Sequence, residues 1–217
     1  MKIPEHPIFQ ESIQYIKSQI GLTGLDWIHQ SVLERMIHAS GDLRLQSLLK
    51  FSPDACEKGI NALISGTKIF TDTRMAVAAI SPMAKRTLNL EVECILKMAP
   101  EIVDSGSSTR SAIGMKNTWL ELEKNYQQAL SPIVVIGSAP SALMSLLDLV
   151  DEGYQLPSLI IGMPVGFIGV SESKNRLLNS HCPHIVLEGS KGGASLASGA
   201  VNALLRVAED QVNSYDV

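Results

Sequence analysis

Five short apolar segments, each followed by small or glycine-rich residues and then by a helix-like segment, constrain the fold of this chain most strongly. The segments are residues 68–72, 92–96, 133–137, 159–163 and 184–188. Strands that alternate with helical segments form βαβ units, whose parallel sheet is covered by helices on both faces. This order predicts an α/β fold with a doubly wound parallel sheet of about five strands.

Amphipathic segments between and before the strands supply the expected helices. Three segments with apolar residues at helical spacing follow strands, and we interpret them as helices of the sheet. They are residues 111–128, 139–150 and 194–208. Three more helical segments precede the first strand as an N-terminal helical preface, which is expected to pack on the same core. They are residues 10–20, 26–38 and 54–65.

The length and charge of the chain limit its organisation and its partners. We predict a single domain, residues 1–217, with a frayed tail at 211–217, because no long linker divides the chain. The net charge of −4 and the 5% aromatic content argue against a nucleic-acid binder. No apolar run approaches the length of roughly 20 residues that a membrane span needs, and the sequence shows no secretory signal. The three cysteines are scattered, so we expect a cytoplasmic protein without a membrane partner.

The carboxyl ends of the predicted strands mark the region where a ligand is expected. Ligands of an open parallel sheet bind in the crevice outside these ends. The loops selected by this rule are residues 71–75, 98–111, 137–142, 162–169 and 189–195. They contain nearly all the unusual loop chemistry of the chain, so the candidate site is expected there.

His38 is the candidate for acid–base chemistry. It lies near the end of a predicted helix, just before Gly41, which is suited to cap that helix. The negative end of a helix dipole stabilises an imidazolium ion by about 0.3–1 kcal/mol and would hold a proton ready for donation. A capping histidine without chemistry explains the position as well. His181 and His184 have metal-like spacing but no third ligand nearby, so we assign no metal site.

Two strand-to-helix turns are candidates for anion binding. In the turn from Ser138 to Ser141, a proline is suited to the first helical turn, and free N–H groups favour an anion. The loop 189–195 adds Lys191 to glycines that allow close backbone approach. Neither loop matches a nucleotide-binding fingerprint. Ordinary strand-to-helix turn chemistry is the alternative for each.

Two other loops contain residues whose type is unusual for their position. Arg110 is expected at the start of a helix, where the dipole disfavours a cation, and a bidentate pair with a ligand carboxylate would explain it. Residues 162–169 combine three glycines and a proline with apolar side chains that suit a broad, flat ligand. The alternatives are a solvated arginine and a buried turn that supports the sheet.

Taken together, these segments resemble the precorrin-8X methylmutase family of cobalamin biosynthesis. The shared motifs occur in the family's order between Ser12 and Leu204, and the longest of them is the most specific. They are RMIHASG at 35–41, FSPD at 51–54, TRSA at 109–112, IGSAPSAL at 136–143, GMPVGFIGVSESK at 162–174 and KGG at 191–193.

The resemblance implies a flavodoxin-like fold, a homodimer and a reaction without a metal or organic cofactor. The family reaction is an intramolecular 1,5-sigmatropic shift of a methyl group from ring carbon 11 to ring carbon 12 of a corrinoid precursor. The product is hydrogenobyrinic acid or, when cobalt is present, cobyrinic acid, and both pathway branches use similar enzymes. The histidine of the family's motif, the proposed proton donor, falls on His38.

The tetrapyrrole substrate carries many carboxylates, which would explain several anion-seeking loops around one crevice. The residues implied to bind it are Ser12, Ser81, Arg110, Ser138, Ala139, Ser141, Met163, Val165, Phe167, Lys191, Gly192 and Gly193. Arg110, Lys191 and turn N–H groups are expected to bind carboxylates, and the apolar residues to face the ring or support their loop. Ser12 and Ser81 are included in this set only because their positions match positions in the family. Ser138 and Ser141 stand where the family more often has Asn and Thr.

Two other functions explain parts of the sequence. A nucleotide- or phosphate-using α/β enzyme would also need glycine-rich turns, although no nucleotide fingerprint is present. A non-catalytic corrinoid carrier would share the pocket but would need no acid at His38.

Overall fold

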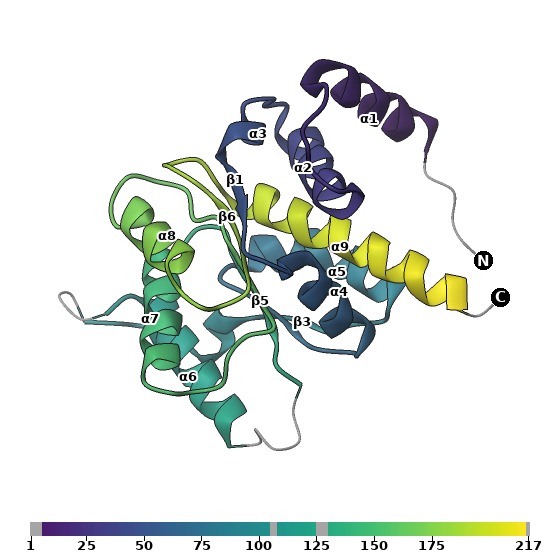
Figure 1. The fold of residues 1–217 in the computed structure, drawn as a ribbon. Coiled ribbons are helices and arrows are strands. Elements are labelled where there is room, and N and C mark those ends of the chain that lie inside the picture. The colour runs from purple at the N-terminus through teal and green to yellow at the C-terminus, as the bar shows by residue number, and fades with distance from the viewer. Residues whose placement is uncertain (1–5, 105–107, 125–129, 216–217) are drawn as a thin grey trace.

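The computed structural model describes residues 6–104, 108–124 and 130–215. Their strands form one six-stranded sheet in the order β1-β6-β5-β4-β2-β3 (Figure 1). The strands are β1 (Leu49–Phe51), β2 (Ile69–Thr71), β3 (Val92–Cys94), β4 (Ile133–Ile136), β5 (Leu159–Gly162) and β6 (His184–Leu187). The strands β2 to β6 are parallel and coincide with the five apolar segments, which confirms the predicted α/β fold.

The sheet has one strand more than the sequence predicted. Strand β1 pairs antiparallel with the edge strand β6, with Leu49 opposite Leu187. The pairing continues beyond the strand, where the Ser52 N–H donates to the carbonyl of His184 at 2.9 Å. The segment is only three residues long and has Lys50 at its centre, so it lacks the continuous apolar run by which the buried strands are recognised.

Helices cover both faces of the sheet, and their bounds match most of the expected segments. They are α1 (Pro7–Ile20), α2 (Trp27–Ser40), α3 (Leu45–Leu48), α4 (Ala55–Ile64), α5 (Arg74–Thr87), the 3-10 turn η1 (Ile95–Met98), α6 (Arg110–Glu123), α7 (Pro140–Asp151), α8 (Val170–Leu178) and α9 (Ala194–Tyr215). Helix α9 continues as far as Tyr215, into the segment 211–217 that was expected to fray. The expected end of the sixth helix at residue 128 lies outside the described residues.

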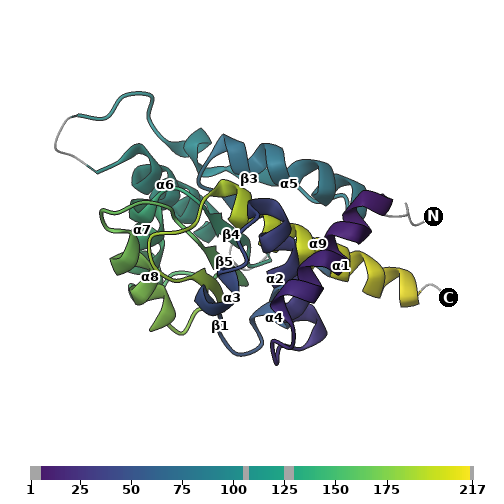
Figure 2. The same ribbon diagram turned by 90° about the horizontal axis from the view of Figure 1, so that it is seen from above.

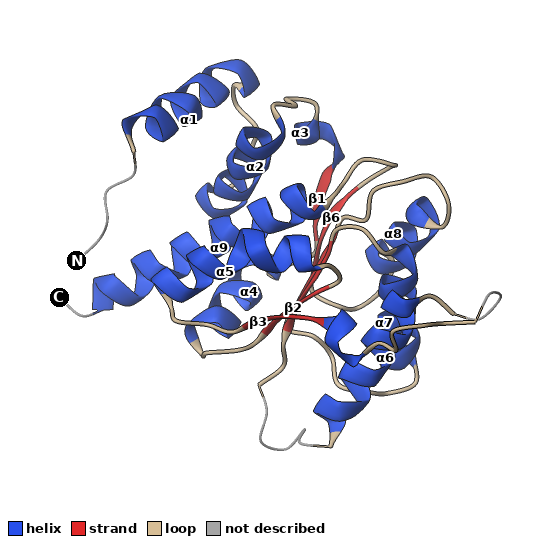
Figure 3. Cartoon of the chain, turned by 180° about the vertical axis from the view of Figure 1, so that it is seen from behind, coloured by secondary structure: helices blue, strands red, loops and turns tan. Residues whose placement is uncertain are grey.

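Side-chain alternation along the strands divides the core into two layers. Ile133 and Val135 of β4 face the layer of α2, α4, α5 and α9. Val134 and Ile136 face α6, α7 and α8 on the other side of the sheet (Figure 3). Viewed from above, α9 lies between α2 and α5, and α1 packs outside α2 (Figure 2). The helical preface therefore joins the core of the sheet, as expected.

We found no helix in the described ranges that combines the length and apolarity required to cross a bilayer.

Candidate active site

His38 lies in the last turn of α2, where two grooves meet. The first groove, about 360 Å³ in volume, is lined by His38, Met75 and Ser195 among others. The second, about 490 Å³, lies between α1 and α2 and is lined by His38 and Ser12. Met75 and Ser195 belong to the first turns of helices that follow β2 and β6. His38 therefore lies beside the carboxyl edge of the sheet, and Ser12, on α1, lies across the second groove.

The pKa of His38 lies below its usual value. Partial burial is the first cause, and repulsion by the Arg35 guanidinium is the second. The ring of Phe9 packs edge-on against His38, with ring centroids 4.9 Å apart. Burial and Arg35 therefore act against the proton that the helix dipole was expected to favour on His38.

A buried carboxylate, Asp72, binds the turn between β4 and α7. The N–H of Gly137 donates to Oδ1 at 3.1 Å, and those of Ser138 and Ala139 donate to Oδ2 at 2.6 and 2.7 Å. Burial raises the pKa of Asp72, and these three donors oppose the rise. The expectation that the Ser138 and Ala139 N–H groups bind ligand carboxylates is corrected, because Asp72 already accepts from both.

Lys191 also has a carboxylate partner within the chain. Its Nζ forms an ion pair with Asp42, in the connection between α2 and α3. Arg44 donates to the same carboxylate from Nε at 2.8 Å and from Nη2 at 3.1 Å. Arg44 first, and then Lys191, hold the pKa of Asp42 far below its usual range. A substrate carboxylate that binds Lys191 must therefore displace Asp42 or share the ammonium with it.

Lys174 of α8 holds the loop between β6 and α9. Its Nζ donates to the carbonyls of Gly189 at 2.8 Å and Lys191 at 2.6 Å. Its side chain is only about 1% exposed, and burial lowers its pKa to about 8. A buried ammonium under this loop fixes the main chain from which the Lys191 side chain extends.

Gly192 and Gly193 allow two loops to pack at the sheet edge. A Cβ on Gly192 would lie 2.1 Å from the carbonyl oxygen of Met163. The Gly193 N–H donates to that same carbonyl at 2.9 Å, so it is occupied within the chain. Met163 is fully buried in the core. Of the two alternatives for Met163, facing the ring or supporting its loop, this burial favours the second.

The first turns of α6 and α7 meet beside the Asp72-bound turn. Thr109, the N-cap of α6, has its Oγ1 2.6 Å from the Oγ of Ser141 in α7. Arg110 follows Thr109, has an exposed side chain, and donates from Nε to the carbonyl of Pro100 at 2.8 Å. The structure therefore brings Arg110 and Ser141 into one cluster at the carboxyl edge.

Of the remaining expected residues, Val165 and Phe167 lie at the carboxyl edge of the sheet, and Ser81 lies on a helix. Val165 and Phe167 lie in the loop after β5 and are 48% and 90% exposed. The Val165 N–H donates to the carbonyl of Gly137 at 3.2 Å, which links this loop to the turn before α7. Ser81 lies half-buried in α5 and lines neither groove beside His38.

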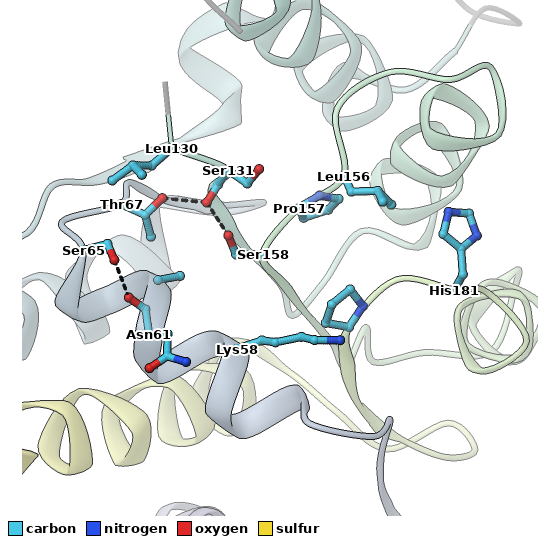
Figure 4. Close-up of a pocket in the computed structure, with 12 residues that line it drawn as sticks. Lys58, Asn61, Ser65, Thr67, Leu130, Ser131, Leu156, Pro157, Ser158 and His181 are labelled. Carbon is cyan, nitrogen blue, oxygen red and sulfur yellow. Dashed lines mark hydrogen bonds between the residues drawn. The ribbon is translucent and has the colours of Figure 1, made fainter. Parts of the chain in front are cut away.

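Another cavity, of about 530 Å³, lies at the opposite edge of the sheet (Figure 4). The carbonyl of Ser131 accepts hydrogen bonds there from the hydroxyls of Thr67 at 2.7 Å and Ser158 at 2.6 Å. These two hydroxyls are thus bound to the main chain. We therefore locate the candidate site at the carboxyl edge, where His38 and the predicted loops lie.

Comparison with known protein families shows which family the chain belongs to. The precorrin-8X methylmutase family model matches residues 7–207. The chain belongs to this family. The match covers every motif from which the resemblance was inferred, and it includes His38, Arg110 and Lys191.

Individual relatives of the precorrin-8X methylmutase family agree over most of the chain. The cobalt-precorrin-8 methylmutase of Synechocystis sp. is 36% identical, with 94% of this chain and 96% of the relative covered. The precorrin-8X methylmutase of Pseudomonas aeruginosa is 35% identical, with coverages of 91% and 93%. The solved structure of precorrin-8X methylmutase from Thermus thermophilus is 34% identical, covers 94% and 96%, and has a TM-score of 0.83.

Sequence reasoning missed the residues that hold this family member's loops in place. Asp72 directly follows a strand within a selected loop, so its position was a usable signal. Lys174 ends the longest family motif, which was also a usable signal, whereas Asp42 gave none, because a charged residue in a turn usually faces solvent. Ser198 and Asn202, which are buried and line the first groove beside His38, were also missed, because both lie inside an apolar helical segment.

Proposed function

We propose that this chain is an isomerase of cobalamin biosynthesis that acts on precorrin-8X or cobalt-precorrin-8. The reaction is the 1,5-sigmatropic shift of a methyl group from ring carbon 11 to ring carbon 12, which gives hydrogenobyrinic or cobyrinic acid. The observation that carries this proposal is the family match over residues 7–207, a range that includes His38 in the RMIHASG motif. The position of that histidine beside two grooves at the carboxyl edge supports the proposal.

His38 is the proposed proton donor to the conjugated ring. A sigmatropic shift needs no nucleophile, and protonation would select the reactive tautomer of the substrate. Burial and Arg35 lower the pKa of His38, which makes its protonated form a stronger acid. When a substrate rich in carboxylates is bound beside His38, its negative charges would favour the protonated imidazole of His38. General acid catalysis of this kind contributes about 10²- to 10⁴-fold to the rate.

The exposed residues at the sheet edge are proposed to bind the substrate periphery. Arg110 and Lys191 would hold carboxylates, and the latter would exchange Asp42 for the substrate. Ser12 lines a groove with His38, and Ser141 lies close to Arg110 through Thr109. Val165 and Phe167 offer exposed apolar surface to the ring. Ser138 would contact the substrate through its side chain, whereas Ala139, Gly192 and Gly193 would contribute through the shape of their turns. Ser81 is included only because its position matches one in the family.

The hydrogen bonds at the turns disfavour the phosphate-binding alternative. A phosphate bound at the start of α7 would require the N–H groups of Gly137, Ser138 and Ala139, which Asp72 occupies. The Gly193 N–H is likewise bound to a main-chain carbonyl.

The wider organisation is proposed from the same family membership. We propose one catalytic domain over residues 1–217, because α1 to α9 pack around a single sheet. A homodimer and a cytoplasmic location remain predictions from the resemblance and from composition. Sedimentation equilibrium of the purified protein tests the dimer directly.

An anaerobic visible-spectrum assay with cobalt-free and cobalt-containing precorrin-8 tests the function. Wild type and His181→Ala, a control at the opposite edge of the sheet, should both convert the pigment, whereas His38→Ala should bind it and turn over about 10²- to 10⁴-fold more slowly. Unchanged turnover by His38→Ala would remove His38 as the acid. Binding without conversion by wild type would favour a carrier, and absence of both would overturn the proposed function.

A further inference from the structure

Asp72 is an internal carboxylate that takes the place of a helix cap. The N-cap residue of α7 is Ala139, whose side chain cannot accept a hydrogen bond. Asp72 reaches this terminus from the end of β2, more than 60 residues earlier in the chain, and is fully buried. No lysine, arginine or histidine within ion-pair distance of Asp72 occurs in the described part of the chain. Its bonding therefore depends on the three main-chain N–H groups of the turn.

The contacts of the turn show what this carboxylate holds in place. The carbonyl of Gly137 accepts the Val165 N–H, which joins the turn to the loop that carries Phe167. On the other side, Ser141 in the first turn of α7 contacts Thr109, the residue before Arg110. A shift of the turn would move both neighbours of the crevice at once. The Asp72 carboxylate is thus linked to the proposed binding groups without contacting the substrate.

We propose that Asp72 is a positioning residue whose carboxylate fixes the β4–α7 turn and thereby aligns the Ser141 and Arg110 cluster for substrate binding. This inference rests on the proposed function, because it concerns the binding surface of the same reaction. The residues so aligned bind the substrate periphery, whereas His38 lies on a different helix. Loss of the carboxylate should therefore raise KM more than it lowers kcat.

Three variants separate alignment from general loss of structure. Asp72→Ala leaves a space that faces three N–H donors, and formate has the size and charge to refill it. Asp72→Asn keeps the space filled but turns an amide donor toward N–H groups. Thr67→Val is the matched control, because Thr67 precedes β2 at the opposite edge, and its hydroxyl makes one part-buried hydrogen bond to Ser131.

The expected result is a rise in KM of about ten- to a hundredfold for Asp72→Ala and Asp72→Asn, with a smaller change in kcat. Formate at tens of millimolar should lower the KM of Asp72→Ala but not that of Asp72→Asn or Thr67→Val. Wild-type KM in Asp72→Ala, or an equal effect of formate on all three variants, would overturn the proposal. If Asp72→Ala does not fold, a wild-type KM in folded Asp72→Asn would overturn it equally.

Amide NMR distinguishes failure of this inference from failure of the proposed function. Formate added to Asp72→Ala should return the N–H resonances of Ser138 and Ala139 toward their wild-type positions, whatever the substrate proves to be. If wild type is inert toward both precorrins while formate restores those resonances in Asp72→Ala, the proposed function is overturned and the anchoring of the turn is still supported. Resonances that do not respond to formate would overturn the anchoring itself.

Discussion

Replacing Lys174 with methionine should destabilise the protein by an amount that increases with pH. The substitution keeps a long side chain in the buried site but removes the donor to the carbonyls of Gly189 and Lys191. A buried carbonyl left without a donor costs about 1–3 kcal/mol, so the two together cost about 2–6 kcal/mol. At neutral pH this loss is offset, because the variant no longer buries a charge.

The size of the offset follows from the pKa of Lys174. Burial lowers that pKa from 10.5 to about 8, and a difference of about 2.5 corresponds to about 3 kcal/mol at 1.36 kcal/mol per unit. The folded pKa lies below the unfolded pKa, so the unfolded chain binds more protons between pH 8 and 10.5. Wild-type stability therefore gains this contribution as pH rises through that window. The neutral amine still has two N–H groups for the two carbonyls.

Urea unfolding of wild type and Lys174→Met at pH 7 and pH 10 measures this difference. The variant should be destabilised by about 2–3 kcal/mol more at pH 10 than at pH 7, because most of the window has then been crossed. Lys58→Met, at an exposed lysine of α4, serves as the control and should show the same small effect at both pH values. A pH-independent cost of Lys174→Met would refute the reasoning.

Three further predictions follow from the same structure. Arg35→Gln should raise the pKa of His38 toward its usual value, because the variant removes a repelling charge. A ¹H–¹³C NMR titration of the imidazole measures this pKa, and an unchanged midpoint would leave burial as the only cause. Gly192→Ala should lower the free energy of unfolding by about 3 kcal/mol or more because its Cβ meets a carbonyl, whereas Gly189→Ala, with a positive φ but open space, should cost about 1–2 kcal/mol; equal costs in urea unfolding would contradict this. The three cysteines are buried and burial raises the pKa of each thiol, so they should react with a disulfide reagent only after unfolding, and fast labelling of the native protein would oppose the prediction.

The strands β2, β4, β5 and β6 could be predicted because they are buried along their whole length and therefore appear as short, mainly apolar runs in the sequence. The edge strand β3 has Glu93 at its centre, and it was recognised because Ile95 and Leu96 extend its apolar run. The antiparallel edge strand β1 could not be predicted, because Lys50 interrupts its three residues and its pairing depends on β6 far along the chain. The extension of α9 past residue 211 was missed for a related reason. Its polar residues were read as the end of a helix, although α9 continues to Tyr215.

The fold class, the family and the edge of the sheet where the site is expected could all be predicted from the sequence, because periodicity and motifs are local properties. Which polar groups face one another at that edge depends on the packed fold. Asp72 occupies the turn N–H groups expected to bind a ligand, and Asp42 pairs with Lys191 across 149 positions of the chain. Such pairings depend on distances between loops that the packed sheet sets, and a charged residue's type does not reveal its partner.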